Sequence, residues 1–288
     1  MRLALGLALA LSAGAGGSRD DEGESPSARA EPAVELGSGA PLTARETKPR
    51  LAPVRVHEPY EDRGVTFLAL PLEELLDERF GEDWREADEV LFICADGYRA
   101  GVPVRRLLAH RPHLAFERVG AEFAIDRSIG GVVRHVPLAP AYLIWERPPA
   151  RESDGLQEMR EASLEWPYQI VRVELASLAD RYARITPEAP ASAEVTRGFE
   201  EFRRYCVRCH AINGQGGELG PELNYPASVT EYMREEWLLR FILEPTSVRH
   251  GTAMPGLPAG LPDREARARD VVAYLEAMAM RKLAPEPG

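Results

Sequence analysis

The sequence predicts two domains of different fold class, an α+β domain followed by an all-α domain. The 288 residues are long enough for two hydrophobic cores. In the first half, apolar residues come in short runs broken by Gly and Pro, which is typical of strands and short helices. In the last third, apolar residues recur at helical spacing. A Pro-rich stretch separates the two patterns and predicts a domain boundary there.

The N-terminus is expected to be a secretory signal peptide over residues 1–15. One Arg precedes a short apolar run, which ends in small residues that favour cleavage near Ala15. A membrane-spanning helix needs roughly 20 apolar residues, so an uncleaved anchor is the less favoured alternative. We therefore expect a mature chain without a membrane span that is periplasmic or otherwise exported.

The α+β domain is expected over residues 51–185, after a flexible tether over residues 16–50 that has few large apolar residues. Buried strands are predicted at 65–70 and 90–94, with a helix between them that begins after Pro71 and ends before Gly81. Further strands are predicted at 113–116, 132–136, 142–145 and 170–175.

The all-α domain is expected over residues 194–284, after a stiff Pro-rich linker over residues 186–193. Its first helix has an apolar face that leads to Cys206, and its last helix has Asp263 as the expected N-cap. The apolar positions are Val195, Phe199 and Phe202 on the first helix, and Val271, Tyr274, Leu275 and Met278 on the last.

The first helix runs into Cys206-Val207-Arg208-Cys209-His210, which matches the CxxCH sequence of covalent haem attachment. Residues three apart share one face of a helical turn, so both thiols can reach one edge of the same porphyrin. His210 is then placed to bind the iron. A zinc site or a redox dithiol is the alternative, but the sequence has no second CxxC and no nearby His pair. We expect one covalent haem c.

With these residues, the stretch 194–284 resembles the class I c-type cytochromes. The resemblance rests on the order of Gly198 and Phe202, the CxxCH motif, Gly220-Pro221, Met254-Pro255 and finally Tyr274-Leu275. It implies that the first and last helices cross at Gly198, Phe202 and Tyr274. It also implies that the carbonyl of Pro221 accepts a hydrogen bond from His210 and orients it.

The second iron ligand is expected to be Met254, which lies in a Pro-bounded loop 44 residues after His210. His250 is an alternative that would give bis-His coordination. Met278 and Met280 are weaker candidates because Met on a helix is usually core filler, and Met233 is weaker because it lies in a polar helical segment. The residues at the positions where the family holds the haem propionates are Tyr225, Tyr232, Trp237 and Arg249.

The first domain shows a weaker likeness. Its segments 92–98, 142–145 and 166–168 resemble the molybdopterin-binding fold of sulfite-oxidase-like proteins. That resemblance implies a thiolate ligand to molybdenum, and Cys94 is the residue that would supply it. The competing interpretation, which we favour, is a buried structural thiol at the end of a strand. We assign no catalytic residue.

The net charge of −11 argues against nucleic acid as a partner. Residues 194–284 carry a net charge of only −1, so the rest of the chain carries −10. This asymmetry favours a redox partner with a basic docking surface. The sequence thus predicts an electron-transfer protein or redox subunit. The alternatives are a molybdenum oxidoreductase that passes electrons to haem, and a haem-based binding or sensing module.

Overall fold

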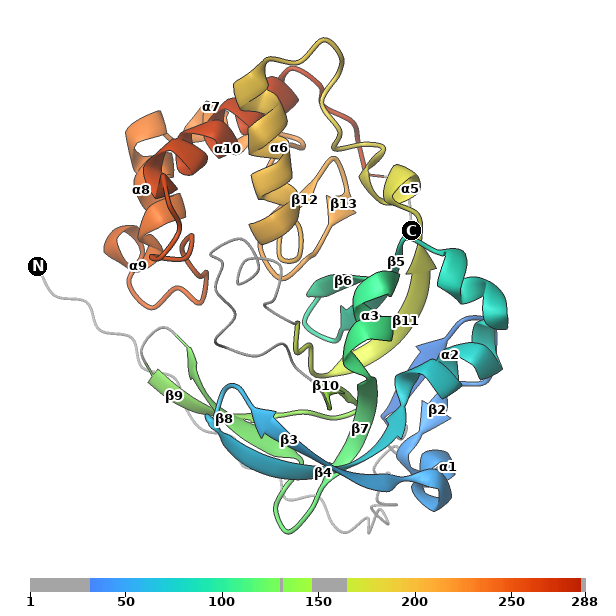
Figure 1. The fold of residues 1–288 in the computed structure, drawn as a ribbon. Coiled ribbons are helices and arrows are strands. Elements are labelled where there is room, and N and C mark those ends of the chain that lie inside the picture. Colours follow the sequence, from blue (N-terminus) through green and yellow to red (C-terminus); the bar gives the residue numbers. More distant parts are fainter. Residues whose placement is uncertain (1–31, 130–131, 147–164, 286–288) are drawn as a thin grey trace, which may run out of the picture. The chain divides into compact units, whose positions relative to one another are not determined.

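The computed structural model describes residues 32–129, 132–146 and 165–285, all of which belong to one compact unit (Figure 1). The expected signal peptide lies outside these residues. The described part consists of a sheet-rich region, residues 32–176, and a helical region, residues 177–285. The expected order of an α+β part and a helical part is therefore observed.

The first sheet of the sheet-rich region has five strands in the order β2-β1-β11-β5-β6. Neighbouring strands are antiparallel except for β1 and β11, which are parallel. The strands are β1 (Ala33–Leu36), β2 (Leu42–Thr43), β5 (Glu89–Cys94), β6 (Arg99–Pro103) and β11 (Ile170–Ala176). The predicted strands at 90–94 and 170–175 are thus confirmed and become neighbours.

The second sheet has four antiparallel strands in the order β10-β7-β4-β3, and β8 and β9 form a separate pair. Its strands are β3 (Ala52–Glu58), β4 (Arg63–Pro71), β7 (Pro112–Arg118) and β10 (Tyr142–Trp145). The separate pair is β8 (Ala124–Ile129) and β9 (Val132–Pro137). The predicted strands at 65–70, 113–116, 132–136 and 142–145 are therefore confirmed.

Short helices connect the strands. The helix predicted between the first two buried strands is α2, which follows Pro71 and ends at Gly81, where φ is +69°. Gly tolerates this left-handed backbone conformation, which explains why the helix ends there. The helical segments of this region are α1 (Ala44–Thr47), η1 (Lys48–Arg50), α2 (Leu72–Phe80), η2 (Glu82–Glu86) and α3 (Val104–His110).

The expectation of a flexible tether over residues 16–50 is wrong for its C-terminal part. Residues 33–50 form β1, β2, α1 and η1, and β1 lies between β2 and β11 in the first sheet. Val34 and Leu36 are fully buried in the core that both sheets share. Burial of these alternating apolar side chains offsets the cost of ordering the segment.

The helical region packs five helices and a small β-ribbon around a separate core. The helices are α6 (Ala193–Tyr205), α7 (Val229–Tyr232), α8 (Glu235–Leu243), α9 (Pro245–Val248) and α10 (Arg264–Ala279), preceded by the short α5 (Leu178–Tyr182). The ribbon pairs β12 (Ala211–Ile212) with β13 (Gln215–Gly216).

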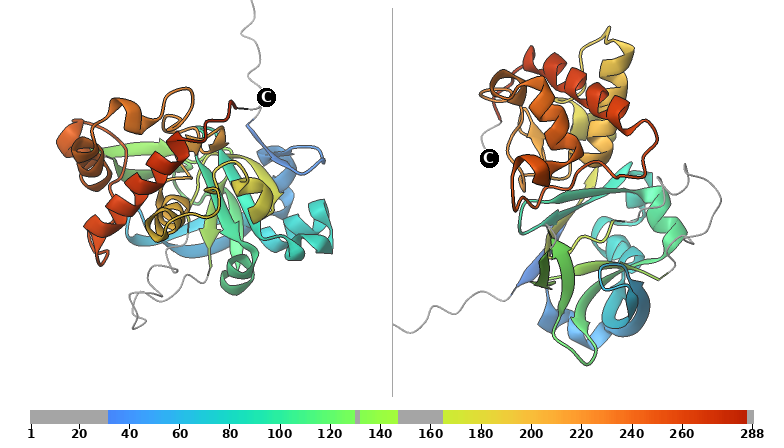
Figure 2. Two further views of the ribbon diagram at one scale, coloured as in Figure 1. Left: turned by 90° about the horizontal axis from the view of Figure 1, so that it is seen from above. Right: turned by 90° about the vertical axis from the view of Figure 1, so that its left-hand side faces the viewer.

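The first and last helices, α6 and α10, cross as expected (Figures 1 and 2). A Cβ atom on Gly198 would lie 1.9 Å from the carbonyl oxygen of Asp270, so only Gly allows this approach. The rings of Phe202 and Tyr274 lie 5.3 Å apart at the same crossing.

Asp263 precedes α10 as expected but does not cap it through its side chain. Its backbone is left-handed, with φ of 52°, and the side chain makes no capping hydrogen bond. Instead its carbonyl oxygen accepts a hydrogen bond from the backbone of Arg267.

The core of the helical region begins before the expected linker. Tyr182 and Ile185, which the expected boundaries assign to the α+β domain, are buried among the apolar side chains of α6, α8 and α10. The Tyr274 hydroxyl donates a hydrogen bond of 2.6 Å to the carbonyl oxygen of Ile185. The structural boundary therefore lies near Ser177, the N-cap of α5. Among the described residues, no helix has both the length and the apolar character needed to cross a membrane.

Candidate functional site

The CxxCH motif continues directly from α6. Ser192 caps the start of this helix by accepting a hydrogen bond from the backbone of Val195. At the other end, the backbone N–H of Cys206 bonds to Phe202, and that of His210 bonds to Cys206. These helical turns hold the motif in the conformation that brings residues three apart onto one side.

The His210 side chain is oriented by Pro221. Its Nδ1 atom lies 2.8 Å from the carbonyl oxygen of Pro221. A carbonyl oxygen only accepts, so Nδ1 carries the proton and Nε2 keeps its lone pair for a metal. Burial lowers the pKa of His210, although the bond to Pro221 opposes the change, and the ring is neutral at pH 7. This is the state that an iron ligand requires.

Gly220 provides the space for that ring. A Cβ atom at this position would lie 2.4 Å from Cε1 of His210, closer than any real contact. The backbone N–H of Gly220 also donates to the carbonyl oxygen of Cys209, at 2.7 Å. The Gly-Pro pair after the motif is thus fitted against His210, which the sequence alone indicated only through family resemblance.

The two motif thiols are free and unpaired in the structure. Burial raises the pKa of Cys206 to about 12 and that of Cys209 to about 11. A redox dithiol needs a lowered pKa, so these thiols do not have the character of a thiol oxidoreductase. Within the described residues, no three His, Cys, Asp or Glu side chains gather as a metal site. The donor set fits covalent haem better than zinc or dithiol chemistry.

A polar network that the sequence did not reveal supports the loop after the motif. Asn213 and Asn224 are buried, and the Asn224 amide donates to Asn213 and to the carbonyl oxygen of Met278 on α10. Glu222 accepts hydrogen bonds from the backbone of Asn213 and Gly214. Buried polar side chains need such partners, so this network fixes the loop that carries Pro221. Only its Asn-Gly turn, where φ is positive at both residues, leaves a signal in the sequence.

Met254 lies in the loop between α9 and α10, where its side chain is half-buried. Its backbone N–H bonds to the hydroxyl of Thr252, which fixes the local turn. The other candidates differ in burial. Met278 is part of the core, Met280 is 89% exposed and His250 is exposed, whereas Met233 packs at the edge of the core. Met254 and Met233 are thus the two partly buried candidates, and the choice of Met254 rests on its place in the Pro-bounded loop.

The four candidates for contacts with haem propionates are all exposed. Tyr225, Tyr232 and Trp237 are between 37% and 63% exposed, and Arg249 is also in the exposed class. None of them is buried against His210. The structure brings together Cys206, Cys209, His210 and Pro221, but it does not single out a propionate partner.

The sheet-rich region contacts the haem motif through the turn between β5 and β6. The backbone N–H of Arg99 donates to the carbonyl oxygen of Arg208, at 2.9 Å, and the N–H of Glu218 donates to Gly97, at 2.8 Å. A Cβ on Gly97 would lie 3.0 Å from the backbone of Glu218, so Gly permits the contact.

Side chains reinforce this contact. The carboxylate of Glu165 forms an ion pair of 2.7 Å with Arg208 and accepts a hydrogen bond of 2.7 Å from the hydroxyl of Tyr98. Arg208 is one of the two residues between the motif cysteines. The sequence did not reveal this contact, because it joins residues far apart along the chain.

Cys94 ends β5 and is 4% exposed. Burial raises the pKa of its thiol well above the ordinary value, so the thiol is protonated at neutral pH. This environment fits a structural thiol better than a metal thiolate.

Comparison with known proteins finds similarity for one part of the chain. The family model described as "Cytochrome C oxidase, cbb3-type, subunit III" matches residues 193–275. A cytochrome c from Rhodothermus marinus is 24% identical, over 35% of this chain and 95% of that chain, with a TM-score of 0.25. No curated protein matches the chain. The family-model match alone identifies residues 193–275 as a cytochrome c domain. These comparisons do not show the resemblance of the sheet-rich region to the molybdopterin-binding fold.

Proposed function

We propose that this protein is an exported monohaem c-type cytochrome that carries electrons through one haem c with His210 and Met254 as axial ligands. The observation that carries this proposal is the neutral His210 held by Pro221 inside a CxxCH motif, within the cytochrome c domain. When bound, the haem supplies an iron that one electron reduces reversibly.

The residues of the chain would act as follows. Cys206 and Cys209 supply the two thiols for the thioether bonds, and His210 presents Nε2 while Pro221 holds its Nδ1 proton. Met254 supplies a thioether sulfur, a ligand that raises the reduction potential of haem iron. Buried apolar side chains beside the motif, Phe202, Val207 and Ile212, would lower the local dielectric constant and so influence the reduction potential.

Export and the partner belong to the same proposal. The N-terminal sequence, with its short apolar run and small residues, supports cleavage near Ala15 and export. The concentration of negative charge outside the cytochrome domain supports a redox partner with a basic surface. Sequencing the N-terminus of the mature protein tests the first part, since an intact Met1 would contradict cleavage.

The decisive test of haem attachment uses full-length protein made in a host with haem-attachment machinery. We expect acid-acetone to leave the haem on the protein, and a Cys206→Ser/Cys209→Ser double variant to be colourless. A Cys94→Ser variant is the matched control and should keep its haem, because Cys94 lies outside the CxxCH motif, at the end of β5. Covalent haem in the double variant would refute the assignment.

The axial ligand is tested separately. The oxidised protein should show the weak near-infrared charge-transfer band of thioether ligation, and Met254→Ala should lose it. Met280→Ala is the control, because Met280 is 89% exposed. If the band persisted in Met254→Ala, another methionine would be the ligand.

A further inference from the structure

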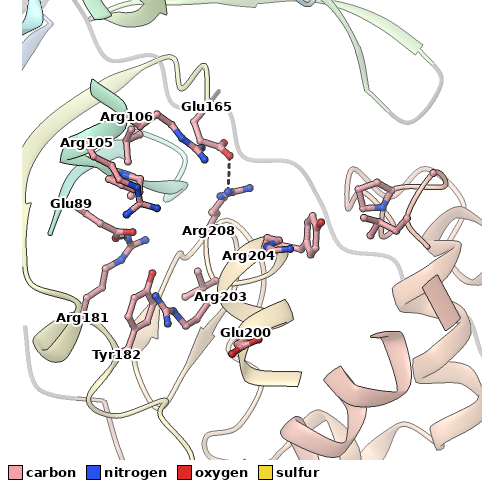
Figure 3. Close-up of a pocket in the computed structure, with 18 residues that line it drawn as sticks. Glu89, Arg105, Arg106, Glu165, Arg181, Tyr182, Glu200, Arg203, Arg204 and Arg208 are labelled. Carbon is pink, nitrogen blue, oxygen red and sulfur yellow. Dashed lines mark hydrogen bonds and ion pairs between the residues drawn. The ribbon is translucent and has the colours of Figure 1, made fainter. Parts of the chain in front are cut away.

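A cavity of about 640 Å³ borders the haem motif, with Val207 and Arg208 in its lining, and the proposed function gives it no role. Its lining comes from strands β5 and β6, helices α3, α5 and α6, and the loop at 258–261 (Figure 3). Arg105 and Arg106 of α3 line one side, and Arg203 and Arg204 of α6 line another. Its volume falls within the roughly 300 to 1,000 Å³ of ordinary small-molecule sites.

The charge of this cavity is opposite to that of the whole chain. Six arginines and three glutamates line it, a surplus of three positive charges in a chain with a net charge of −11. The arginines are Arg105, Arg106, Arg181, Arg203, Arg204 and Arg208, and the glutamates are Glu89, Glu165 and Glu200. The positively charged guanidinium groups repel one another, and an anion bound between them would offset this repulsion.

The glutamates neutralise only two of the six arginines through ion pairs. Glu89 pairs with Arg181 and Glu165 pairs with Arg208, so two of the three carboxylates are already engaged. Arg105 and Arg204 form no ion pair with any residue that the structure describes. Two guanidinium groups thus remain available on opposite sides of the cavity.

Arg203 gives a second, independent indication. Its guanidinium lies over the ring of Tyr182, 4.3 Å from the centroid. The ring holds the guanidinium in place at the wall of the cavity. An anion in the cavity would bind its terminal nitrogens, because Nε itself is buried.

We propose that this cavity binds a small organic oxyanion with at least two negative charges, such as a polycarboxylate or an organic phosphate. Guanidinium groups bind carboxylate and phosphate oxygens through paired hydrogen bonds, which selects this chemistry. The volume favours an organic molecule over a bare inorganic ion, which would leave most of the space to water. The proposal does not depend on the identity of the iron ligands.

Citrate is the probe for the test. We expect calorimetric titration of the purified holoprotein with citrate, at constant ionic strength, to show saturable binding of one citrate per chain. Inorganic phosphate should compete with citrate but bind more weakly, because it reaches fewer of the arginines. If citrate did not saturate the holoprotein, including the case in which the haem's own propionates occupy the arginines, the proposal would be overturned.

Variants locate the binding site. Arg105→Gln/Arg204→Gln should lower the affinity for citrate at least about tenfold, since charged hydrogen bonds are lost on two sides. The control Arg234→Gln/Arg269→Gln removes the same charge from exposed positions outside the cavity and should leave the affinity within about twofold. Equal losses in both double variants would show general electrostatic attraction and refute the site.

Two further measurements keep the test independent of folding defects. Arg203→Lys keeps the charge but removes Nε and the guanidinium fork, and should lower the affinity for citrate while the circular dichroism spectrum stays unchanged. A polyglutamate peptide tests the other class of anionic ligand. If the peptide bound at the cavity and citrate did not, an acidic protein segment would be the ligand and the small-molecule proposal would be wrong.

Discussion

Glu61 and Arg118 form a nearly buried ion pair in the sheet-rich region, with side chains 7% and 8% exposed. Both guanidinium nitrogens of Arg118 bond to the carboxylate, at 2.9 and 2.8 Å, and the backbone of Asp126 adds a further hydrogen bond. Hydrogen bonding to Arg118 lowers the pKa of Glu61 to about 2. Glu61 thus links three strands. It lies just before β4, and it bonds to Arg118 of β7 and to Asp126 of β8.

We predict that Glu61→Gln lowers the free energy of unfolding at pH 7 by about 2 to 3 kcal/mol, because it leaves Arg118 buried without its charged partner. The folded-state pKa lies below the unfolded value of about 4.3, so the contribution is complete above that pH and is lost as pH falls toward 2. Urea unfolding at pH 7 and pH 3 should therefore show a smaller difference between variant and wild type at pH 3.

Glu35→Gln is the control for this prediction. Glu35 also pairs with an arginine, Arg172, but both side chains are about half exposed, and such pairs contribute little. An equal loss of stability in both variants would show that burial of the Glu61 pair is not the cause.

At the scale of elements, the crossing of α6 and α10 positions the motif. Gly198 allows the two helices to approach, and Phe202 and Tyr274 fill the space beside it. Because α6 ends at Tyr205, directly before Cys206, any change in the crossing moves the haem-attachment residues.

We predict that Gly198→Ala destabilises the protein by about 1 to 3 kcal/mol, because the new Cβ would meet the carbonyl of Asp270. The direction is informative, since Ala in an open helix would stabilise by about 1 kcal/mol relative to Gly. Chemical denaturation of the holoprotein measures the effect. Gly260→Ala, where no atom lies within 4 Å of the added Cβ, should change stability little. Wild-type stability of Gly198→Ala would contradict the close crossing.

At the scale of the whole molecule, the helical region includes residues that precede the Pro-rich stretch. We expect a fragment starting at Ser177 to fold and take up haem, because it keeps Tyr182 and Ile185 in the core. A fragment starting at residue 194 loses both and should be less stable by at least about 3 kcal/mol.

Thermal unfolding of the two fragments, compared with full-length protein, measures this difference. Equal stability would mean that Tyr182 and Ile185 add nothing to the helical core. Failure of both fragments to take up haem would instead show that the contact between Gly97 and the haem motif is essential for folding.

The net charge of −11, which favours a basic partner, predicts how the rate of electron transfer depends on salt. Electron transfer to a cationic reagent such as hexaammineruthenium should slow as salt increases, since exposed charges are screened over about 10 Å at 0.1 M. Transfer to the anionic hexacyanoferrate should accelerate under the same conditions. Stopped-flow measurements test both. Rates that do not depend on salt for either reagent would remove electrostatic steering from the proposal.

By itself, the sequence determined the local features of this protein. Short apolar runs predicted the strands at 65–70, 90–94 and 170–175, and helical apolar spacing predicted α2 and the two helices α6 and α10. The CxxCH spacing indicated the haem-attachment site, because backbone geometry alone places residues three apart. This signal is short-range and can be read directly from spacing, whereas the Gly220-Pro221 pair was indicated by the resemblance to class I c-type cytochromes.

Only the tertiary structure decided the long-range features. It placed β1 beside β11, the turn at Gly97 on the haem motif, and Tyr182 in the helical core. It also gathered six arginines from separate elements around one cavity. Each of these depends on contacts between residues far apart along the chain. No periodicity or spacing encodes which distant faces meet, because burial and pairing across the fold decide that.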